Sequence, residues 1–302
     1  CSLMRLDSIK GWRKDVVEKL IEAKVPVLRF PGGCYTTFFN WREWAVLRNE
    51  RRAMPSFFWG GLDENDTGID EFLDLCEASG AKPQICINMM TSNAFEAASL
   101  VEYCNGADDS PMGKLRVFNG IKRNMKVRFW EMDNEAARKW SPLQYAERVV
   151  EFARKMRDAD PDIFIMMEYY TFGVENLKPM LQIAGKFIDA VIHRNTDSKL
   201  IMFSNEMLNE YNKENGTKIV FVNTEWLSEV KWPEPFTDTQ VPHDFNMGSY
   251  GRGDYKKTLN FRQISWFYAL NAAGIISDFV NFKENIYLAN FNNCVNTWGQ
   301  NI

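Results

Sequence analysis

The chain has 302 residues, of which 45% are hydrophobic and 14% aromatic, and its formal net charge is −4. A chain of this length can bury one sizeable hydrophobic core. Its mild acidity and its scattered Lys and Arg residues argue against a nucleic-acid partner. No apolar run approaches the roughly 18 residues that a membrane helix requires. The composition therefore indicates a globular protein with no nucleic-acid or membrane partner.

The six cysteines show neither a CxxC motif nor the Cys/His spacing of a metal site. Most of them fall in predicted helices or strands, where a cysteine acts as a small hydrophobic residue. A chain without a disulfide framework is typical of a reducing compartment, which favours the cytoplasm. A leader removed before Cys1 would instead indicate a secreted or periplasmic protein.

Helices and short apolar strands alternate along most of the chain. The predicted helices are Ser8–Ala23, Ile69–Ser79, Ala94–Cys104, Pro142–Asp158, Glu175–Ala184, Lys199–Glu214 and Tyr255–Ala273. The predicted strands are Val25–Phe30, Lys82–Asn88, Val127–Glu135, Ile163–Tyr169, Phe187–His193 and Lys218–Trp226. This alternation indicates parallel strands joined by right-handed crossovers. An open doubly wound sheet and a closed barrel both fit it.

Polar residues gather at the carboxyl ends of several of these strands, which favours the barrel. A (β/α)8 barrel places its site on that face, whereas an open sheet gathers ligand groups at one switch point. Two long irregular segments, 34–66 and 228–254, are predicted to cover the same rim, and the aromatic residues of the first are typical of a functional lid. We therefore expect one α/β barrel domain over residues 1–302.

Glu135 and Glu225 each end an apolar strand, and together they indicate chemistry. A single Glu at a strand end is usually only a solvated side chain. Two of them at one barrel mouth suit glycoside hydrolysis, in which retaining enzymes hold two carboxyls about 5–5.5 Å apart and inverting ones hold them farther apart. The acid must stay protonated near neutral pH, which requires an apolar surround or a neighbouring negative charge such as ionised Glu225. Two carboxylates suffice for this chemistry, so no metal or organic cofactor is expected.

Several segments resemble, in order, the α-L-arabinofuranosidases of glycoside hydrolase family 51, which are retaining (β/α)8 enzymes. The matching segments are Leu28–Cys34, Asp70–Phe72, Val101–Gly106, Trp130–Glu135, Ile188–His193 and Thr224–Trp226. They span about residues 8 to 226, and a fainter match covers 289–296. One such segment would be a weak signal, but the ordered set is specific.

The resemblance implies a role for each matching residue. Glu135 would be the general acid/base, Glu225 the nucleophile, and Asn134 the partner of the sugar 2-OH. The other expected substrate-binding residues are Arg29, Cys34, Asn88, His193 and Trp226. From the residues alone, Arg29 could equally be the ion-pair partner of an inward acid. A lone His at a strand end is more often a hydrogen-bonded rim residue than a catalyst, so His193 would at most orient the nucleophile.

The chain departs from the family pattern near the expected site. Asp133 stands where the family usually has Gly and adds a charge beside the acid, Asn195 stands where it usually has Tyr, and Glu168 is a rival acid. The family's first strand and its C-terminal β-sandwich are not evident, so we expect an incomplete barrel.

These departures lie in the expected pocket and therefore bear on the choice of substrate more than on the type of reaction. We expect an enzyme that releases α-L-arabinofuranosyl residues from plant polysaccharide. The alternatives are an endoglucanase or β-xylosidase of the same clan, and a carbohydrate-binding protein without turnover. Association into a homo-oligomer stays open.

Overall fold

The computed structural model describes residues 8–57, 61–63, 65–121, 125–194, 196–227, 266–282 and 286–292. Within these ranges, seven parallel strands form one sheet. Their order is β11 (Ile286–Phe291), β10 (Val220–Trp226), β9 (Ala190–Ile192), β8 (Phe164–Glu168), β7 (Phe129–Met132), β6 (Lys82–Ile87) and β3 (Val27–Phe30). Cα atoms of the two outermost strands, β11 and β3, approach within 8 Å, so the sheet curls into a nearly closed barrel. The barrel prediction is confirmed, and an open sheet is excluded.

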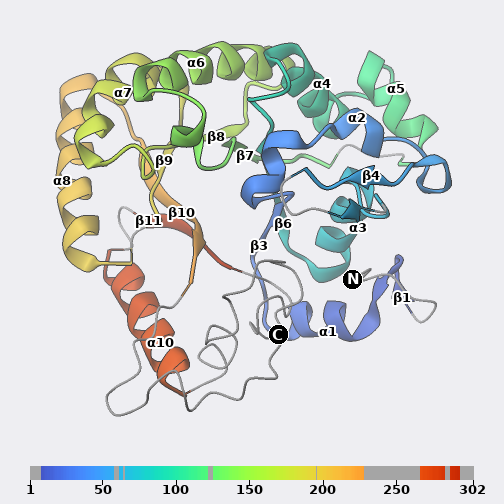
Figure 1. The fold of residues 1–302 in the computed structure, drawn as a ribbon, viewed down its shortest axis with the longest axis horizontal. Coiled ribbons are helices and arrows are strands. Elements are labelled where there is room, and N and C mark those ends of the chain that lie inside the picture. The colour runs from blue at the N-terminus through green and yellow to red at the C-terminus, as the bar shows by residue number, and fades with distance from the viewer. Residues whose placement is uncertain are drawn as a thin grey trace.

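Helices surround the strands on the outside of this barrel (Figure 1). The longer ones are α1 (Lys14–Glu22), α3 (Ile69–Ser79), α4 (Ala94–Asn105), α5 (Pro111–Phe118), α6 (Pro142–Ala159), α7 (Leu177–Ala184), α8 (Ser198–Asn215) and α10 (Trp266–Asn281). Several begin at side chains that bind the free N–H groups of the first turn. Asn93 caps α4, Asp197 caps α8, and Ser141 with Gln144 forms a capping box at α6. These residues explain why the helices start where the sequence pattern predicts.

Two apolar layers pack against the sheet. Successive side chains of a strand point to opposite faces, so each strand contributes to both layers. Trp130 and Met132 of β7 belong to the outer layer with Val149 and Phe152 of α6. A separate cluster inside the barrel comprises Phe129, Phe164, Met166, Ala190, Ile192 and Val222. Because apolar side chains fill this part of the barrel, it is a packed core below the site.

The first predicted helix is too long at its start. Residues 8–13 instead form a small hairpin of β1 (Ser8–Ile9) and β2 (Trp12–Arg13). Lys10 and Gly11 make its turn with φ of 51° and 88°, the left-handed pair typical of two-residue hairpins. The Trp12 indole donates a hydrogen bond to the Glu71 carbonyl at 2.8 Å, which anchors the hairpin on α3.

The segment 34–66 is not one long loop. It contains the 3₁₀ helices η1 (Gly33–Phe38) and η2 (Arg48–Glu50), α2 (Trp41–Trp44), and the paired strands β4 (Met54–Pro55) and β5 (Leu62–Asp63). Phe39, Trp41 and Trp44 are buried in the core, with the Phe39 and Trp44 rings 4.7 Å apart. The prediction that the aromatic residues of this segment mark a lid is therefore wrong for these three. The predicted loop 228–254 lies outside the described residues.

Candidate active site

A buried carboxylate in the middle of β7 forms the floor of the site. Glu131 is fully buried and accepts two hydrogen bonds from Arg29, from Nε at 2.6 Å and from Nη2 at 2.7 Å. Gln84, Cys86 and Thr224 also donate to it, at 2.9, 3.1 and 2.8 Å. Burial alone would raise the pKa of Glu131, but the charge and hydrogen bonds of Arg29 outweigh it and hold that pKa below its usual value. Glu131 thus ties β3, β6 and β10 to β7 across the barrel interior.

Arg29 connects this floor to the predicted site residues. Its Nη1 lies 3.2 Å from Glu225 Oε2, and its Nη2 donates to Asn134 Oδ1 at 2.9 Å. The interpretation of Arg29 as the ion-pair partner of an inward acid, Glu131, is confirmed. Its expected contact with the substrate stays a prediction.

Glu225 lies in β10 and is held from three sides. Arg29 and Arg194 both contact its Oε2, Arg194 through Nη1 at 3.0 Å. Asn292, directly after β11, donates to its Oε1 at 2.9 Å. Two guanidinium groups and one amide therefore fix the orientation of this carboxylate.

Glu135 follows β7 at the same end of the barrel. Its Oε2 lies 2.7 Å from Arg138 Nη1 and accepts a hydrogen bond from the Cys34 thiol at 3.3 Å. Burial, and secondarily Glu135 itself, raises the pKa of Cys34 to about 11, so the thiol is protonated at neutral pH and can donate. The sequence argument expected an apolar or negatively charged surround for Glu135. The structure instead places the guanidinium groups of Arg138 and Arg194 against it.

Arg194 brings the two candidate carboxylates into one site. A single atom, its Nη1, lies 3.0 Å from Glu225 Oε2 and 3.7 Å from Glu135 Oε1. The two oxygens can therefore be no farther apart than the sum of these distances. Arg194 Nη2 also donates to Asn134 Oδ1, and its guanidinium lies over the Tyr170 ring, 4.5 Å from the centroid.

The Asn88 side chain forms hydrogen bonds within the loop after β6 and to the Phe39 carbonyl. Its side chain donates to the Phe39 carbonyl at 3.0 Å and to the Thr91 hydroxyl at 2.7 Å. Its oxygen accepts hydrogen bonds from the backbone N–H groups of Met90 and Thr91. Asn88 therefore fixes the loop after β6 against the segment that carries Cys34.

His193 and Trp226 pack beneath the site. His193 is 1% exposed, and its ring meets the rings of Phe221 and Phe279 edge-on. Trp226 is 4% exposed and packs edge-on against Phe279 and Phe291. Both side chains stabilise the ends of β9 and β10 and are covered by aromatic rings.

The departure at Asp133 is accommodated by its backbone and by a cation. Asp133 has φ of 63°, in the left-handed region where glycine is favoured. Its carboxylate accepts hydrogen bonds from the N–H groups of Met89 at 2.9 Å and Asn134 at 2.7 Å, and it forms an ion pair with Lys139. The added charge is thus balanced locally. Asn195 lies outside the described residues.

Sequence reasoning missed most of the charged partners of the two glutamates. The residues it did not assign to the site are Glu131, Arg138, Arg194 and Asn292, and it treated Glu168 only as a rival acid. One signal was available for Glu131 and Glu168: each is the only polar residue of an otherwise apolar strand. A charged residue within a buried strand indicates a paired or functional group, because Glu is almost never fully buried without a partner.

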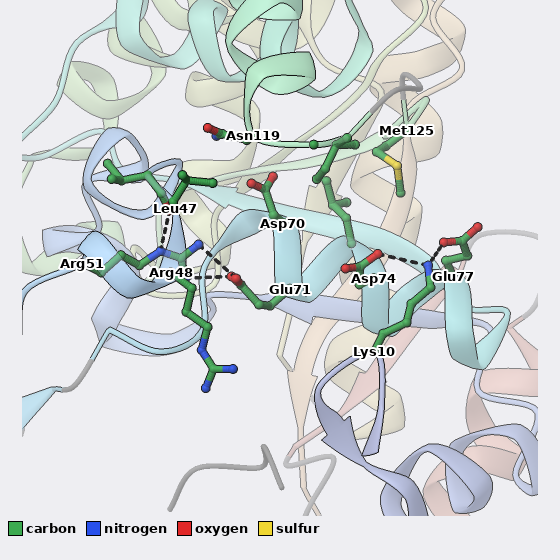
Figure 2. Close-up of a pocket in the computed structure, with 14 residues that line it drawn as sticks. Lys10, Leu47, Arg48, Arg51, Asp70, Glu71, Asp74, Glu77, Asn119 and Met125 are labelled. Carbon is green, nitrogen blue, oxygen red and sulfur yellow. Dashed lines mark hydrogen bonds and ion pairs between the residues drawn. The ribbon is translucent and has the colours of Figure 1, made fainter. Parts of the chain in front are cut away.

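A cavity of about 580 Å³ lies against α3 and is lined by none of these residues. Figure 2 shows three of its acidic side chains, Glu71, Asp74 and Glu77, directed at Arg51 or Lys10. Glu71 pairs with Arg51 at 2.8 Å, and Asp74 pairs with Lys10 at 3.1 Å. Asp70 accepts a hydrogen bond from Tyr103 at 2.8 Å, and burial raises its pKa to about 6. These partners make the cavity a structural junction.

Two features are absent from the described part of the chain. No group of three or more His, Cys, Asp or Glu side chains is arranged to hold a metal ion there. None of the helices in those ranges combines the length and apolar character needed to cross a membrane.

The chain is thus a parallel α/β barrel with a paired-carboxylate site: Glu135 and Glu225, at the carboxyl ends of β7 and β10, both contact Arg194. Residues 19–215 match the family described as "Alpha-L-arabinofuranosidase 1 domain". The chain belongs to this family, and the resemblance seen in the sequence is confirmed.

Curated relatives match part of the chain. It is 37% identical over 183 residues to Alpha-L-arabinofuranosidase C of Emericella nidulans, which covers 55% of this chain and 36% of that protein. It is also 37% identical over 132 residues to the Intracellular exo-alpha-L-arabinofuranosidase of Bacteroides ovatus, covering 43% of this chain and 26% of that protein. The chain thus spans only about a third of the length of the first of these relatives.

Solved structures match almost the whole chain in fold. The arabinose complex of the alpha-L-arabinofuranosidase from Thermotoga maritima has a TM-score of 0.79 and 23% identity, over 98% of this chain and 60% of that one. The family 51 alpha-L-arabinofuranosidase AbfB of Bifidobacterium longum has a TM-score of 0.82 and 21% identity, over 98% of this chain and 64% of that one. At these identities the likeness establishes the barrel fold.

Proposed function

We propose that this chain forms the catalytic barrel of a retaining glycoside hydrolase that removes terminal non-reducing α-L-arabinofuranosyl residues from plant-type arabinose-containing polysaccharides. Glu225 is the nucleophile and Glu135 the general acid/base. The observation that carries the proposal is the contact of one atom, Arg194 Nη1, with both carboxylates, because it brings the two groups within reach of one sugar. Membership of the arabinofuranosidase family supports the choice of sugar.

In the first step Glu225 attacks the anomeric carbon while Glu135 gives its proton to the departing oxygen. In the second step Glu135 takes a proton from water, and the water oxygen displaces Glu225 from the sugar. Arg29 and Asn292 hold the two oxygens of Glu225, so the carboxylate is oriented before the sugar arrives. The same Arg29 holds Asn134, the proposed partner of the sugar 2-OH.

The proposed reaction requires the Arg194 side chain to move away from at least one of the two carboxylates. The anomeric carbon must lie between Glu135 and Glu225, and the guanidinium of Arg194 contacts both carboxylates there. Tyr170 offers this guanidinium a stacking surface at 4.5 Å. An entering sugar therefore displaces Arg194 from at least one carboxylate.

A carbohydrate-binding homologue without turnover is the second candidate. The contact that favours it is the 2.7 Å ion pair between Arg138 and Glu135, because a carboxylate held by a guanidinium must first release it to transfer a proton. Arg138 is more than half exposed, so sugar binding can remove this contact at little cost.

A panel of nitrophenyl glycosides tests the proposal, with α-L-arabinofuranoside, β-D-xylopyranoside and β-cellobioside as substrates. We expect release from the arabinofuranoside, with net retention of configuration in the product sugar. Preferred release from another member of the panel would support a different activity of the clan. Binding of L-arabinose without release from any glycoside would establish the second candidate.

A further inference from the structure

Glu168, at the carboxyl end of β8, binds the backbone of the residue that carries the proposed acid. Its side chain is 1% exposed. Oε2 accepts a hydrogen bond from the Glu135 N–H at 2.8 Å, and Oε1 accepts hydrogen bonds from the Ala136 N–H and from the Thr171 hydroxyl, the latter at 2.5 Å. Both oxygens of this buried carboxyl are therefore engaged, and two of the donors belong to the turn after β7.

That turn has an unusual backbone. Asp133 and Glu135 are both non-glycine residues in the left-handed region, with φ of 63° and 52°. L-residues occupy this region only where surrounding contacts compensate the strain. In the first half of the turn, the Asp133 carboxylate supplies such contacts by accepting hydrogen bonds from the Met89 and Asn134 N–H groups. In the second half, the Glu168 carboxyl supplies them by accepting hydrogen bonds from the Glu135 and Ala136 N–H groups.

The surroundings of Glu168 argue against its use as a rival acid. Burial raises its pKa to about 7, against the opposing effects of Thr171, the Ala136 N–H and Arg194. Its oxygens nevertheless point at backbone groups and at Thr171. Tyr145 further links the two strand ends, because its hydroxyl donates to the Met132 carbonyl at 2.6 Å and accepts from the Glu168 N–H at 3.3 Å. The hydrogen bonds of Glu168 therefore hold the turn after β7 in place.

We propose that Glu168 is a positioning residue for Glu135: its buried carboxyl holds the left-handed turn that directs the Glu135 side chain toward Glu225. This inference rests on the proposed function for its catalytic consequence. The family resemblance does not indicate this role, because Glu168 is one of the positions at which the chain departs from the family pattern.

The structural part of the proposal is tested by amide hydrogen exchange in the folded protein. We expect the Glu135 and Ala136 amides to exchange at least about tenfold faster in Glu168→Ala, and by a smaller factor in Glu168→Gln, which keeps one acceptor oxygen. Glu151→Gln removes an exposed carboxylate from α6 and is the matched control, with exchange like that of the unmodified protein. Unchanged exchange of both amides in both Glu168 variants would overturn the proposal.

The catalytic part is tested by leaving-group dependence. A misplaced acid slows glycosides with poor leaving groups, such as phenyl α-L-arabinofuranoside, and spares the 2,4-dinitrophenyl glycoside, which needs no protonation. We expect kcat/KM of Glu168→Gln to fall at least about tenfold for the first and less than about twofold for the second. Equal losses on both would overturn the positioning role. If the unmodified protein hydrolyses neither glycoside, the proposed function fails, whereas the exchange result still decides whether Glu168 holds the turn.

Discussion

The guanidinium of Arg194 lies 3.0 Å from the Glu225 carboxylate, and the same nitrogen reaches Glu135 at 3.7 Å. A cation thus occupies the place between the proposed nucleophile and the proposed acid. A positive charge held there resembles the charge that develops on the sugar ring in an oxocarbenium-like transition state. Arg194 is therefore in direct competition with the substrate for both carboxylates.

Removal of this competitor should change ligand binding in a defined way. We predict that Arg194→Ala becomes sensitive to guanidinium ion, with an inhibition constant at least about tenfold lower than in the unmodified protein, or about 1.4 kcal/mol. Inhibition of arabinofuranoside hydrolysis by millimolar guanidinium chloride gives the comparison, with sodium chloride at equal ionic strength as control. Equal inhibition of both proteins would show that Arg194 does not compete with cations for this position.

Of all substitutions in the site, replacement of the proposed nucleophile Glu225 should reduce kcat most. Glu225→Gln keeps the shape of the side chain and its contact with Asn292 but removes the negative charge that attacks the sugar. We predict a loss in kcat on the order of 10⁴-fold or more. The free energy of unfolding should fall by less than in Glu131→Gln, because Glu225 is partly exposed whereas Glu131 is fully buried. Initial rates on an aryl arabinofuranoside, together with a urea titration, check both halves. Residual activity above about one per cent would point to a different nucleophile.

The effect of removing the proposed acid Glu135 should depend on the leaving group of the substrate. Glu135→Ala removes proton donation, a contribution of about 10²–10⁴-fold where the leaving oxygen needs it. We predict a loss of that size on phenyl α-L-arabinofuranoside and a much smaller loss in kcat/KM on the dinitrophenyl glycoside. Added azide should restore turnover of the latter by attacking the glycosyl-enzyme. Equal loss on the two glycosides would count against Glu135 as the acid.

The Glu131–Arg29 pair should make stability depend on pH in the acid range. Because the folded-state pKa of Glu131 lies below its usual value near 4.5, its contribution is present above that value and is lost as pH falls through the folded-state pKa. Glu131→Gln leaves Arg29 without its buried partner and should cost about 3–5 kcal/mol at neutral pH. Urea unfolding at several pH values measures both effects, with Glu151→Gln expected within about 0.5 kcal/mol of the unmodified protein. A cost independent of pH would contradict this assignment.

Glu168 should give the opposite dependence. Burial raises its pKa from a usual value near 4.5 to about 7, so the folded state binds a proton more tightly than the unfolded chain does. Its contribution to stability should therefore decrease as pH rises from about 4.5 to 7. We predict that Glu168→Gln, which cannot ionise, flattens the decline of the melting temperature over this range. An identical slope in both proteins would contradict the raised pKa.

The sequence predicted the order of the elements well, because their signals are local. The helix Ile69–Ser79 agrees at both ends, where Gly68 and Glu71 form its first turn and Gly80 ends it at φ of 77°. Segments whose shape depends on distant contacts were predicted poorly. The sequence of residues 8–13 predicts the start of a helix. In the structure these residues form a hairpin, which is anchored by the hydrogen bond from Trp12 to the Glu71 carbonyl of α3.

The candidate site followed the same division. Glu135 and Glu225 could be named because strand ends and a family motif are visible in the sequence. The roles of Glu131 and Arg194 depend on which face of a strand points into the barrel and on partners that are distant in the chain. Arg29 and Glu131, for example, are 102 positions apart. Such a register becomes visible only when neighbouring strands are aligned.

The proposed double displacement requires Glu225 to form a covalent bond to the sugar. In Glu135→Ala, an activated aryl α-L-arabinofuranoside should still arabinosylate the nucleophile, while hydrolysis of the intermediate is slowed. Mass spectrometry of the quenched and digested protein should then find one arabinosyl group on the peptide that contains Glu225. An arabinosyl group on Glu168 or on any other residue, or rapid aryl release with no labelled peptide, would contradict the account.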